Sequence, residues 1–424
     1  MKVLVVGSGG RESAICWQFS KEASIEKVYC APGNDGIVEI AEIVNISAYD
    51  FENLTNFVKA NKIDFTFVGP EIPLSLGIVD YFNSCGLKII GPSKEAAKLE
   101  SSKIYSKYFM DKYNIPTAKY SSFSDVGRAL DFIDSLNKDN KIVIKADGLA
   151  AGKGVHICSC KKEAKNIVHK IMSEKVLDDA GTNILIEEYI EGEELSYLLF
   201  TDGTSYSLMP ASQDHKRVKD KDQGLNTGGM GAYAPAPLTT DNLNEKVENI
   251  VKKVSNGITQ EKLEYKGILY VGIIVREGLP YVLEFNCRFG DPETQAVLPL
   301  LETDLSDICI AILEGKLSQL QIKWKNKFSV CVVLASGGYP EDFKTGFEIK
   351  GLENIATDAI IFYAGIKFVD GKFITSGGRV LGITAIGDNI KEAINKVYAN
   401  VNLVHFDGMH FRKDIARRAL NGKY

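Results

Sequence analysis

The sequence predicts a multidomain protein with an open parallel α/β sheet at the N-terminus and α+β domains behind it. At 424 residues the chain is too long for one compact core. Over residues 1 to about 100, short apolar strands alternate with helical periodicity, which is typical of a parallel sheet with helices on both faces. From about residue 327 the pattern is α+β, with strands at Phe328–Leu334, Ile360–Ala364, Lys367–Phe368 and Val380–Ile386 and a helix at Ile390–Ala399. We expect this last part to serve packing.

The composition is that of an ordinary globular protein. Hydrophobic residues make up 45% of the chain and charged residues 25%, and the formal net charge of −5 gives no sign of a nucleic-acid partner. The apolar run from Val3 to Val6 is too short for a signal peptide, and no later stretch is long enough to cross a bilayer. The eight cysteines lack the spacing of a zinc site or a disulfide framework. We therefore expect reduced thiols, no membrane partner and a cytoplasmic location.

Glycine-rich turns follow the predicted N-terminal strands directly. The expected strands are Val3–Val6, Lys27–Cys30, Ile43–Ile46, Ile63–Val68 and Lys88–Ile90, and helical periodicity covers Ser13–Phe19 and Phe51–Val58. In an open α/β sheet, ligands bind at the carboxyl ends of the strands. The turn from Gly7 to Glu12 lacks the third glycine of the dinucleotide fingerprint. It could bind a phosphate at the start of a helix, beside Arg11, or be only a tight structural turn.

A glycine-rich loop in the middle of the chain has the composition of a phosphate-binding lid. A helix is expected near Lys103–Lys112, and the loop Ala146–Gly154 lies between the strands Ile142–Lys145 and Val155–Ile157. It is not a P-loop, because Gly148 is one residue too close to Lys153 and Gly154 stands where Ser or Thr should be. A loop between two antiparallel strands can close over a triphosphate, with its amides and Lys153 neutralising charge. We favour this lid over an ordinary hairpin.

Two further segments carry polar residues suited to substrates. In Asn183–Ser196 an apolar strand runs into Glu187 and Tyr189-Ile190, which suits an adenine slot, and Glu194 could accept the ribose hydroxyls. The alternative for this acidic span is a solvated surface. Gln213–Arg217 then precedes Thr227–Gly231, whose amides should be free to approach an anion closely. The lone His215 in the first of these is more often structural than catalytic.

The strand Tyr281–Asn286 carries a candidate metal site. Side chains alternate along a strand, so Glu284 and Asn286 should project from one face about 7 Å apart, while Phe285 points the other way. Two oxygen ligands with open positions suit Mg²⁺ that also holds nucleotide phosphates. Arg288 and Asp291 follow within a few residues. The alternative is an edge strand with a solvated polar face.

Together these segments resemble the ATP-grasp superfamily and, within it, the phosphoribosylamine–glycine ligases (glycinamide ribonucleotide synthetases). The resemblance covers essentially the whole chain. It is carried by VLVVGSGGRE, APGNDG, VGPEIPL, IKADGLAAGKGV, IEEYIEGEELS, SQDHKRVKDKDQGLNTGGMGAYAPAP, LEFNCRFGDPETQ and GGRVLGITA. The SQDHKR block and EFNCRFGDPET separate these ligases from sister enzymes. Ser13 stands where the family usually has His, and Gly272 stands about where many sister enzymes place a second metal carboxylate.

The resemblance implies a central ATP-grasp fold of two α+β subdomains at residues 102–326, with a mobile lid subdomain at about 118–192. Residues 1–101 would form an N-terminal substrate domain and residues 327–424 a small C-terminal domain. The implied reaction joins glycine to 5-phosphoribosylamine through glycyl phosphate, in purine biosynthesis. It uses ATP and Mg²⁺ or Mn²⁺. The implied state is a monomer that transiently contacts the upstream amine-producing enzyme.

The resemblance also implies a role for each candidate residue. The ATP contacts would be Lys103, Lys107, Lys145, Gly152, Lys153, Gly154, Glu187, Tyr189, Ile190 and Glu194. The metal ligands would be Glu284 and Asn286, and the catalytic residues Arg288, Lys153, Asp214 and Lys216. Glycine and the amine would lie against Asp214, Thr227, Gly228, Gly229, Met230, Gly231, Arg288 and Asp291, and the ribose phosphate against Gly9, Gly10, Arg11, Asn34 and Glu71.

Three other functions compete with this one. A related ATP-grasp ligase with a different acceptor would share the lid and the metal strand, so substrate trials must separate the two. A dinucleotide-dependent oxidoreductase is disfavoured by the missing third glycine at Gly7–Glu12. A non-catalytic ATP-binding protein is disfavoured because Lys153, Glu284 and Asn286 are all in place.

Overall fold

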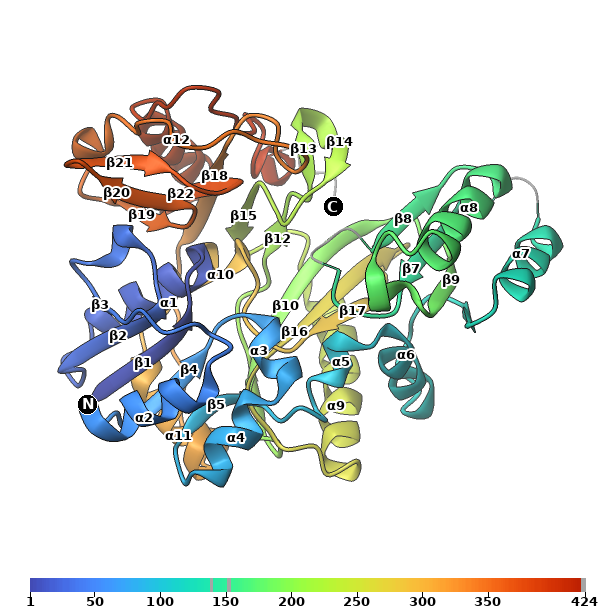
Figure 1. The fold of residues 1–424 in the computed structure, drawn as a ribbon, viewed down its shortest axis with the longest axis horizontal. Helices are drawn as coiled ribbons and strands as arrows, with labels where there is room; N and C mark the ends of the chain where they lie inside the picture. Colours follow the sequence, from blue (N-terminus) through green and yellow to red (C-terminus); the bar gives the residue numbers. More distant parts are fainter. Residues whose placement is uncertain (138–139, 151–153, 421–424) are drawn as a thin grey trace.

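The computed structural model describes residues 1–137, 140–150 and 154–420 of the chain. It confirms the predicted class, a mixed molecule with a parallel sheet at the N-terminus and α+β parts behind it (Figure 1). Gly152 and Lys153, which were predicted in the phosphate lid, lie outside the described residues.

One nine-stranded sheet runs through the N-terminal and central parts of the molecule, in the order β11-β10-β16-β5-β4-β1-β2-β3, with β17 paired to β16. The strands are β1 Lys2–Gly7, β2 Lys27–Pro32, β3 Glu42–Ile43, β4 Phe65–Val68, β5 Ile89–Pro92, β10 Glu193–Thr201, β11 Tyr206–Leu208, β16 Tyr265–Arg276 and β17 Leu279–Asn286. β1 to β5 are parallel, as predicted. β16 is antiparallel to β5, so the N-terminal sheet continues into the central one. Local periodicity did not predict this continuity.

Alternate residues of β1 bury against different helices. Val3 and Val5 share a core with α1 (Gly10–Ser20) and α11 (Leu305–Glu314). Leu4 and Val6 share another with α2 (Phe51–Asn61) and α4 (Ile78–Ser84), while α3 (Glu71–Leu76) precedes α4. Because both faces are covered, the strand is apolar throughout rather than alternating, as expected for a parallel sheet.

Helix α1 begins three residues before the predicted start at Ser13. Gly9 caps the helix, and the carboxylate of Glu12 accepts a hydrogen bond from the Gly9 amide at 2.7 Å. The helix contacts β19 (Ala359–Tyr363), which belongs to the C-terminal part. Ser13 is 1% exposed, and its hydroxyl accepts a hydrogen bond from the Tyr363 amide at 3.0 Å. The Ser13 hydroxyl therefore links helix α1 to strand β19 of the C-terminal part.

A separate four-stranded sheet, in the order β6-β9-β7-β8, projects to the right in Figure 1. Its strands are β6 Tyr120–Phe123, β7 Ile142–Ala146, β8 Val155–Cys158 and β9 Ile184–Glu188, with helices α7 Val126–Ser135 and α8 Lys161–Val168. β7 and β8 are antiparallel, as predicted for the strands that flank the glycine loop. Helix α6 (Lys103–Lys112), which precedes this sheet, has the predicted bounds.

The C-terminal sheet contains strands from two distant parts of the sequence, in the order β12-β15-β18-β22-β19. β18 (Phe328–Ala335), β20 (Ile366–Val369), β22 (Arg379–Gly387) and helix α12 (Ile390–Val401) agree with the prediction. β21 (Lys372–Thr375), which pairs with β20, was not predicted. β12 (Gln213–Asp214) and β15 (Gly231–Ala234) come from before residue 327, where the C-terminal domain was expected to begin. The sheet therefore holds both ends of the segment that was predicted to face substrates.

Within the described ranges, no helix is long and apolar enough to cross a membrane. All eight cysteines are free; six are buried, whereas Cys85 is half-buried and Cys160 is exposed.

Candidate active site

Glu284 and Asn286 lie near the carboxyl end of β17, and Gly272 of β16 pairs directly with Glu284. The register shifts between Gly272 and Ile273, so that Leu283 is an extra residue in β17. The strict alternation predicted across Tyr281–Asn286 is therefore wrong at Leu283, because a bulge interrupts it. Glu284 and Asn286 both follow the bulge, so their two-residue spacing is kept.

The carboxylate of Glu284 has the electrostatic surroundings of a cation ligand. Burial alone would raise its pKa, but Lys216, Lys145, Lys103 and Arg288 outweigh burial and lower the pKa below the ordinary value. No described residue donates a hydrogen bond to this carboxylate or forms an ion pair with it. The carboxylate is therefore ionised and has no hydrogen-bond or ion-pair partner among the described residues. An ionised carboxylate beside an amide oxygen fits a hard divalent cation. Within the described ranges, no group of three or more His, Cys, Asp or Glu residues is placed to hold a metal ion.

Arg288 is held by two acidic residues. Its Nη2 lies 2.8 Å from Glu100 Oε1, and its Nε lies 3.3 Å from Glu71 Oε2. The same Nη2 donates to Asn286 Oδ1 at 3.3 Å. The structure therefore brings Arg288 against one predicted metal ligand. Glu100 was not predicted.

Three predicted phosphate-binding lysines converge from α6 and β7, but two of them share a buried counter-ion. Glu187, 4% exposed, lies 2.9 Å from Lys145 Nζ and 3.4 Å from Lys107 Nζ. Burial lowers the pKa of Lys107 to about 8, with Glu187 opposing and Lys145 reinforcing this shift. Lys103 donates to the carbonyl of Gly148, in the glycine loop, at 2.9 Å. The carboxylate of Glu187, predicted to contact adenosine, forms ion pairs with both lysines.

An apolar cluster lies beside these lysines. Ile190 packs with Ala118 and Ile274, and Tyr281 and Leu283 complete the cluster. Tyr189, the other predicted adenine contact, lies under Lys141, whose Nζ is 4.6 Å from the ring centroid. Apolar side chains therefore gather around Ile190, where adenine was predicted to lie.

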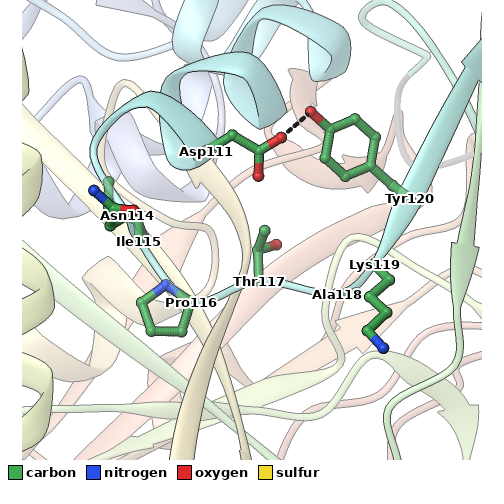
Figure 2. A pocket seen from close by; sticks show the side chains of 8 residues that line it. All are labelled: Asp111, Asn114, Ile115, Pro116, Thr117, Ala118, Lys119 and Tyr120. Carbon is green, nitrogen blue, oxygen red and sulfur yellow. Dashed lines mark hydrogen bonds between the residues drawn. The ribbon is translucent and has the colours of Figure 1, made fainter.

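Figure 2 shows a pocket on the connection between α6 and β6. It is lined by Asp111, Asn114, Ile115, Pro116, Thr117, Ala118, Lys119 and Tyr120, and the Tyr120 hydroxyl donates to Asp111 at 2.7 Å. Thr117 links this connection to the site, because its hydroxyl donates to the carbonyl of Val282 at 2.7 Å and accepts from Lys107 Nζ at 2.6 Å. None of the predicted site residues lines this pocket.

Asp214 and Lys216 lie in a second charged cluster. Lys216 Nζ is 2.6 Å from Glu194 Oε2, so the residue predicted to hold ribose faces the lysine predicted to act on substrates. Asp214 is 9% exposed, and its carboxylate has no hydrogen bond or ion pair among the described residues. Burial raises the pKa of Asp214 to about 7, with Lys216 opposing and Glu293 reinforcing the shift.

Glu293 was not predicted. It is 4% exposed, and its Oε1 accepts a hydrogen bond from the Ser196 hydroxyl at 3.2 Å. Ser196 also contacts the Tyr270 hydroxyl at 2.8 Å. The only sequence signal for this residue was its place within the family segment LEFNCRFGDPETQ.

The prediction of free amides at Thr227–Gly231 is wrong for the first four residues. The amide of Thr227 donates to the Lys216 carbonyl and that of Met230 to the His215 carbonyl. Those of Gly228 and Gly229 donate to the hydroxyls of Tyr339 and Thr227. Glycine permits a close approach, but here the protein itself supplies the acceptors, as buried amides require. His215 is fully buried, and neither ring nitrogen has a hydrogen-bond partner among the described residues, in keeping with a structural role.

The N-terminal candidates lie against the loop after β17 but are mostly engaged within the protein. Arg11 pairs with Glu12 at 2.6 Å and donates to the Phe289 carbonyl at 3.1 Å, and Glu71 lies 3.8 Å away. The side-chain amide of Asn34 donates to the carbonyls of Ser8 and Tyr363. Because Glu12 accepts the Gly9 amide, that amide is not free for a phosphate, contrary to prediction. Gly10 lies against Gln295.

Replacing Gly272 by alanine should weaken metal binding without changing the fold. A Cβ at this position would lie 3.2 Å from Glu284 Cγ and 3.2 Å from Tyr270 Cε1, so the Glu284 side chain would have to shift. We expect the metal concentration for half-maximal turnover to rise about three- to tenfold, equivalent to roughly 1 kcal/mol. Titration of activity with Mg²⁺ measures this. The exposed Gly127→Ala in α7 is the control, and equal metal dependence of both variants would contradict the expectation.

Three family models match the chain in order. They are described as the N domain of phosphoribosylglycinamide synthetase over residues 1–100, its ATP-grasp (A) domain over residues 101–294 and its C domain over residues 329–418. The phosphoribosylamine–glycine ligase of Caldanaerobacter subterraneus subsp. tengcongensis is 49% identical over 417 residues, covering 98% of this chain and 99% of that protein. The ligase of the same name from Escherichia coli K12 is 45% identical over 427 residues, covering 99% of each.

Solved structures agree with these matches. The phosphoribosylamine–glycine ligase of Thermotoga maritima superposes with a TM-score of 0.86 at 32% identity, covering 98% of this chain and 100% of that one. The biotin carboxylase domain of Hydrogenobacter thermophilus 2-oxoglutarate carboxylase has a TM-score of 0.75 at 18% identity, covering 97% and 91%, which shows a shared fold. On these grounds the chain belongs to the phosphoribosylglycinamide synthetase family, whose central domain is an ATP-grasp domain.

Proposed function

We propose that this chain joins glycine to 5-phosphoribosylamine, converting ATP to ADP and phosphate and yielding glycinamide ribonucleotide for purine biosynthesis. The observation that carries the proposal is the Glu284 carboxylate, which has no hydrogen-bond or ion-pair partner among the described residues and is surrounded by four cationic side chains. The chain also matches this family over nearly its full length. A cluster of this kind suits a triphosphate with its metal, because phosphoryl transfer mostly requires positioning and charge neutralisation.

The nucleotide would lie between the four-stranded sheet and the end of β17. Lys103, Lys107, Lys145 and the loop with Lys153 would surround the phosphates, and the slot at Ile190 would hold adenine. Glu284 and Asn286 would hold a divalent cation, Mg²⁺ or Mn²⁺, which supplies charge neutralisation for the phosphates. Glu187 would hold the side chains of Lys107 and Lys145 in place until phosphate is present. Glu194 could turn from Lys216 to the ribose hydroxyls.

The chemistry then needs no protein nucleophile. The carboxylate of glycine attacks the γ-phosphorus, the bond to the bridging oxygen breaks, and ADP leaves. The amine of phosphoribosylamine attacks the carbonyl carbon of glycyl phosphate, phosphate leaves and the nitrogen loses a proton. Arg288 would stabilise charge on the transferred phosphoryl group. Residues 118–192 would close over the site and exclude water from the acyl phosphate.

The direct test measures ADP release with ATP, glycine and freshly prepared phosphoribosylamine, against mixtures that omit one substrate. We expect release that depends on both glycine and the amine. Release that depends on neither, or on another acceptor in place of the amine, would refute the proposal. Sedimentation of the same sample tests whether the active species is a monomer. Turnover with Mg²⁺ against Mn²⁺ tests metal preference.

Asp214 should make glycine binding depend on pH near neutrality. Its raised pKa of about 7 means that the carboxyl is protonated at lower pH and ionised at higher pH. If the ionised form binds the ammonium of glycine, the KM for glycine should fall as pH rises from 6 to 8. Asp214→Asn should raise this KM by roughly 10- to 100-fold, the value of a charged hydrogen bond, and remove the pH dependence. Asp241→Asn, at an exposed position, is the control.

A further inference from the structure

The loop Thr227–Gly231 is held from two sides by residues of the C-terminal part. Arg379, the first residue of β22, donates from Nη1 to the carbonyl of Gly228 at 2.8 Å and to that of Gly229 at 3.4 Å. Tyr339 accepts the Gly228 amide through its hydroxyl at 3.1 Å. Both peptide groups of Gly228 are therefore fixed by side chains more than a hundred residues away in the sequence.

Arg379 also holds the loop after β17. Its Nη1 donates to the Asp291 carbonyl at 2.7 Å, and its Nη2 lies 3.0 Å from Asp291 Oδ2. The other carboxylate oxygen of Asp291 accepts from Gln295 Nε2 at 2.7 Å. Asp291, which was predicted to contact substrate, is thus engaged on both oxygens. One guanidinium joins the glycine loop to the segment that follows the metal strand.

The contacts continue from the glycine loop to Lys216. The amide and the hydroxyl of Thr227 both donate to the Lys216 carbonyl, at 2.8 Å and 2.9 Å. Lys216 in turn forms an ion pair with Glu194. In the sequence, only His215 separates Lys216 from Asp214. The place where the Lys216 side chain leaves the backbone is therefore set by the loop that Arg379 holds.

We propose that Arg379 is a positioning residue, which clamps Gly228, Gly229 and Asp291 and thereby holds Lys216 and Asp214 where glycine and the amine bind. The inference rests on the proposed function. A guanidinium suits this task because it is planar and offers several donors in fixed directions, which a lysine does not. A Cβ at position 228 would lie 3.1 Å from Arg379 Cζ, so the guanidinium would have to shift slightly to admit it.

The test compares Arg379→Met, Arg379→Lys and Tyr339→Phe with Arg417→Met, an exposed arginine of the C-terminal part. Each variant is measured for the KM of glycine and of the amine, for kcat, and for the dissociation constant of ATP. Hydrogen exchange of the segment 214–231 is followed by mass spectrometry without substrates. Hydrogen exchange reports whether Arg379 holds this segment even in a variant that has no enzymatic activity.

We expect Arg379→Met to lower kcat/KM for glycine by about 100-fold, the cost of a small misplacement of reacting groups, and to speed exchange at 214–231. The affinity for ATP should stay within about twofold, because the lysines of α6 and β7 do not contact Arg379. Arg379→Lys should recover part of the loss. Tyr339→Phe should lower kcat/KM about threefold, since it removes one hydrogen bond.

Two results would overturn the inference. One is unchanged exchange and unchanged glycine kinetics in Arg379→Met. The other is an equal loss of ATP and glycine binding, which would mean a general structural role. If Arg379→Met does not fold, Arg379→Lys and Tyr339→Phe carry the same comparison. If the wild type is active and the variants match it in glycine kinetics and hydrogen exchange, only the role of Arg379 is refuted. If the wild type itself shows no glycine-dependent ADP release, the proposed function is refuted.

Discussion

Replacing Glu284 by glutamine is expected to lower kcat by about 1000-fold or more, equivalent to roughly 4 kcal/mol of transition-state stabilisation. The substitution keeps the size of the side chain and removes the negative charge that faces Lys103, Lys145, Lys216 and Arg288. A divalent cation would then have only the amide of Asn286 and the new amide as protein ligands. Because neutral amides bind Mg²⁺ less well than a carboxylate, raising the metal concentration should recover little activity.

The variant should stay folded, because the Glu284 carboxylate has no ion-pair partner among the described residues. Circular dichroism and the Tm measure this, and ADP release over a range of Mg²⁺ concentrations measures the effect. Glu191→Gln is the matched control, because Glu191 is exposed on the connection between β9 and β10. Wild-type turnover and metal dependence in Glu284→Gln would show that the metal lies elsewhere.

Helices and strands of this site could be predicted where the sequence pattern within the element itself determines its structure. The strand of Glu284, helix α6 and the strands beside the glycine loop follow from apolar periodicity and turn residues within a few positions. The capped start of α1 was missed because Gly9 is a weak signal for an N-cap, although Glu12 stands three residues later where a capping box requires it. The bulge at Leu283 was missed because it depends on the register with β16.

Pairings between distant segments could not be predicted from the sequence. The junction of β5 with β16 and the entry of β12 and β15 into the C-terminal sheet depend on strands far apart in the chain. The same holds for partners of charged groups. Arg379 follows two glycines in the sequence, and nothing near it indicates Asp291 as its partner. A glycine-rich composition predicted a permissive backbone at Thr227–Gly231, but not which atoms satisfy its amides.

Replacing Arg288 by methionine is expected to destabilise the protein as well as to inactivate it. The guanidinium pairs with Glu100 and Glu71, and the Glu100 side chain is only 7% exposed. Removing one partner of a buried ion pair leaves an uncompensated charge, at a cost of about 3–5 kcal/mol. The methionine keeps much of the side-chain volume, so a cavity adds little. Chemical denaturation measures the loss of unfolding free energy.

Stability and catalysis can be separated by adding Glu100→Gln to Arg288→Met. The double variant no longer buries an unpaired carboxylate, so we expect it to recover about 2 kcal/mol of stability while remaining inactive. If activity returned together with stability, Arg288 would be a structural residue and not one that acts on the phosphoryl group. Arg276→Met, at the exposed end of β16, is the control for loss of an arginine.

The pH dependence of stability provides a second check on the same pair. Burial raises the pKa of Glu100 even in the wild type, and Arg288 opposes that shift, so removing Arg288 should raise the pKa further. The folded state of Arg288→Met then binds a proton that the unfolded state has released, and stability falls as pH rises. We expect Arg288→Met to be relatively more stable at pH 6 than at pH 8, and the double variant to lose this slope. The same slope in both variants would mean that Glu100 is not the group left unpaired.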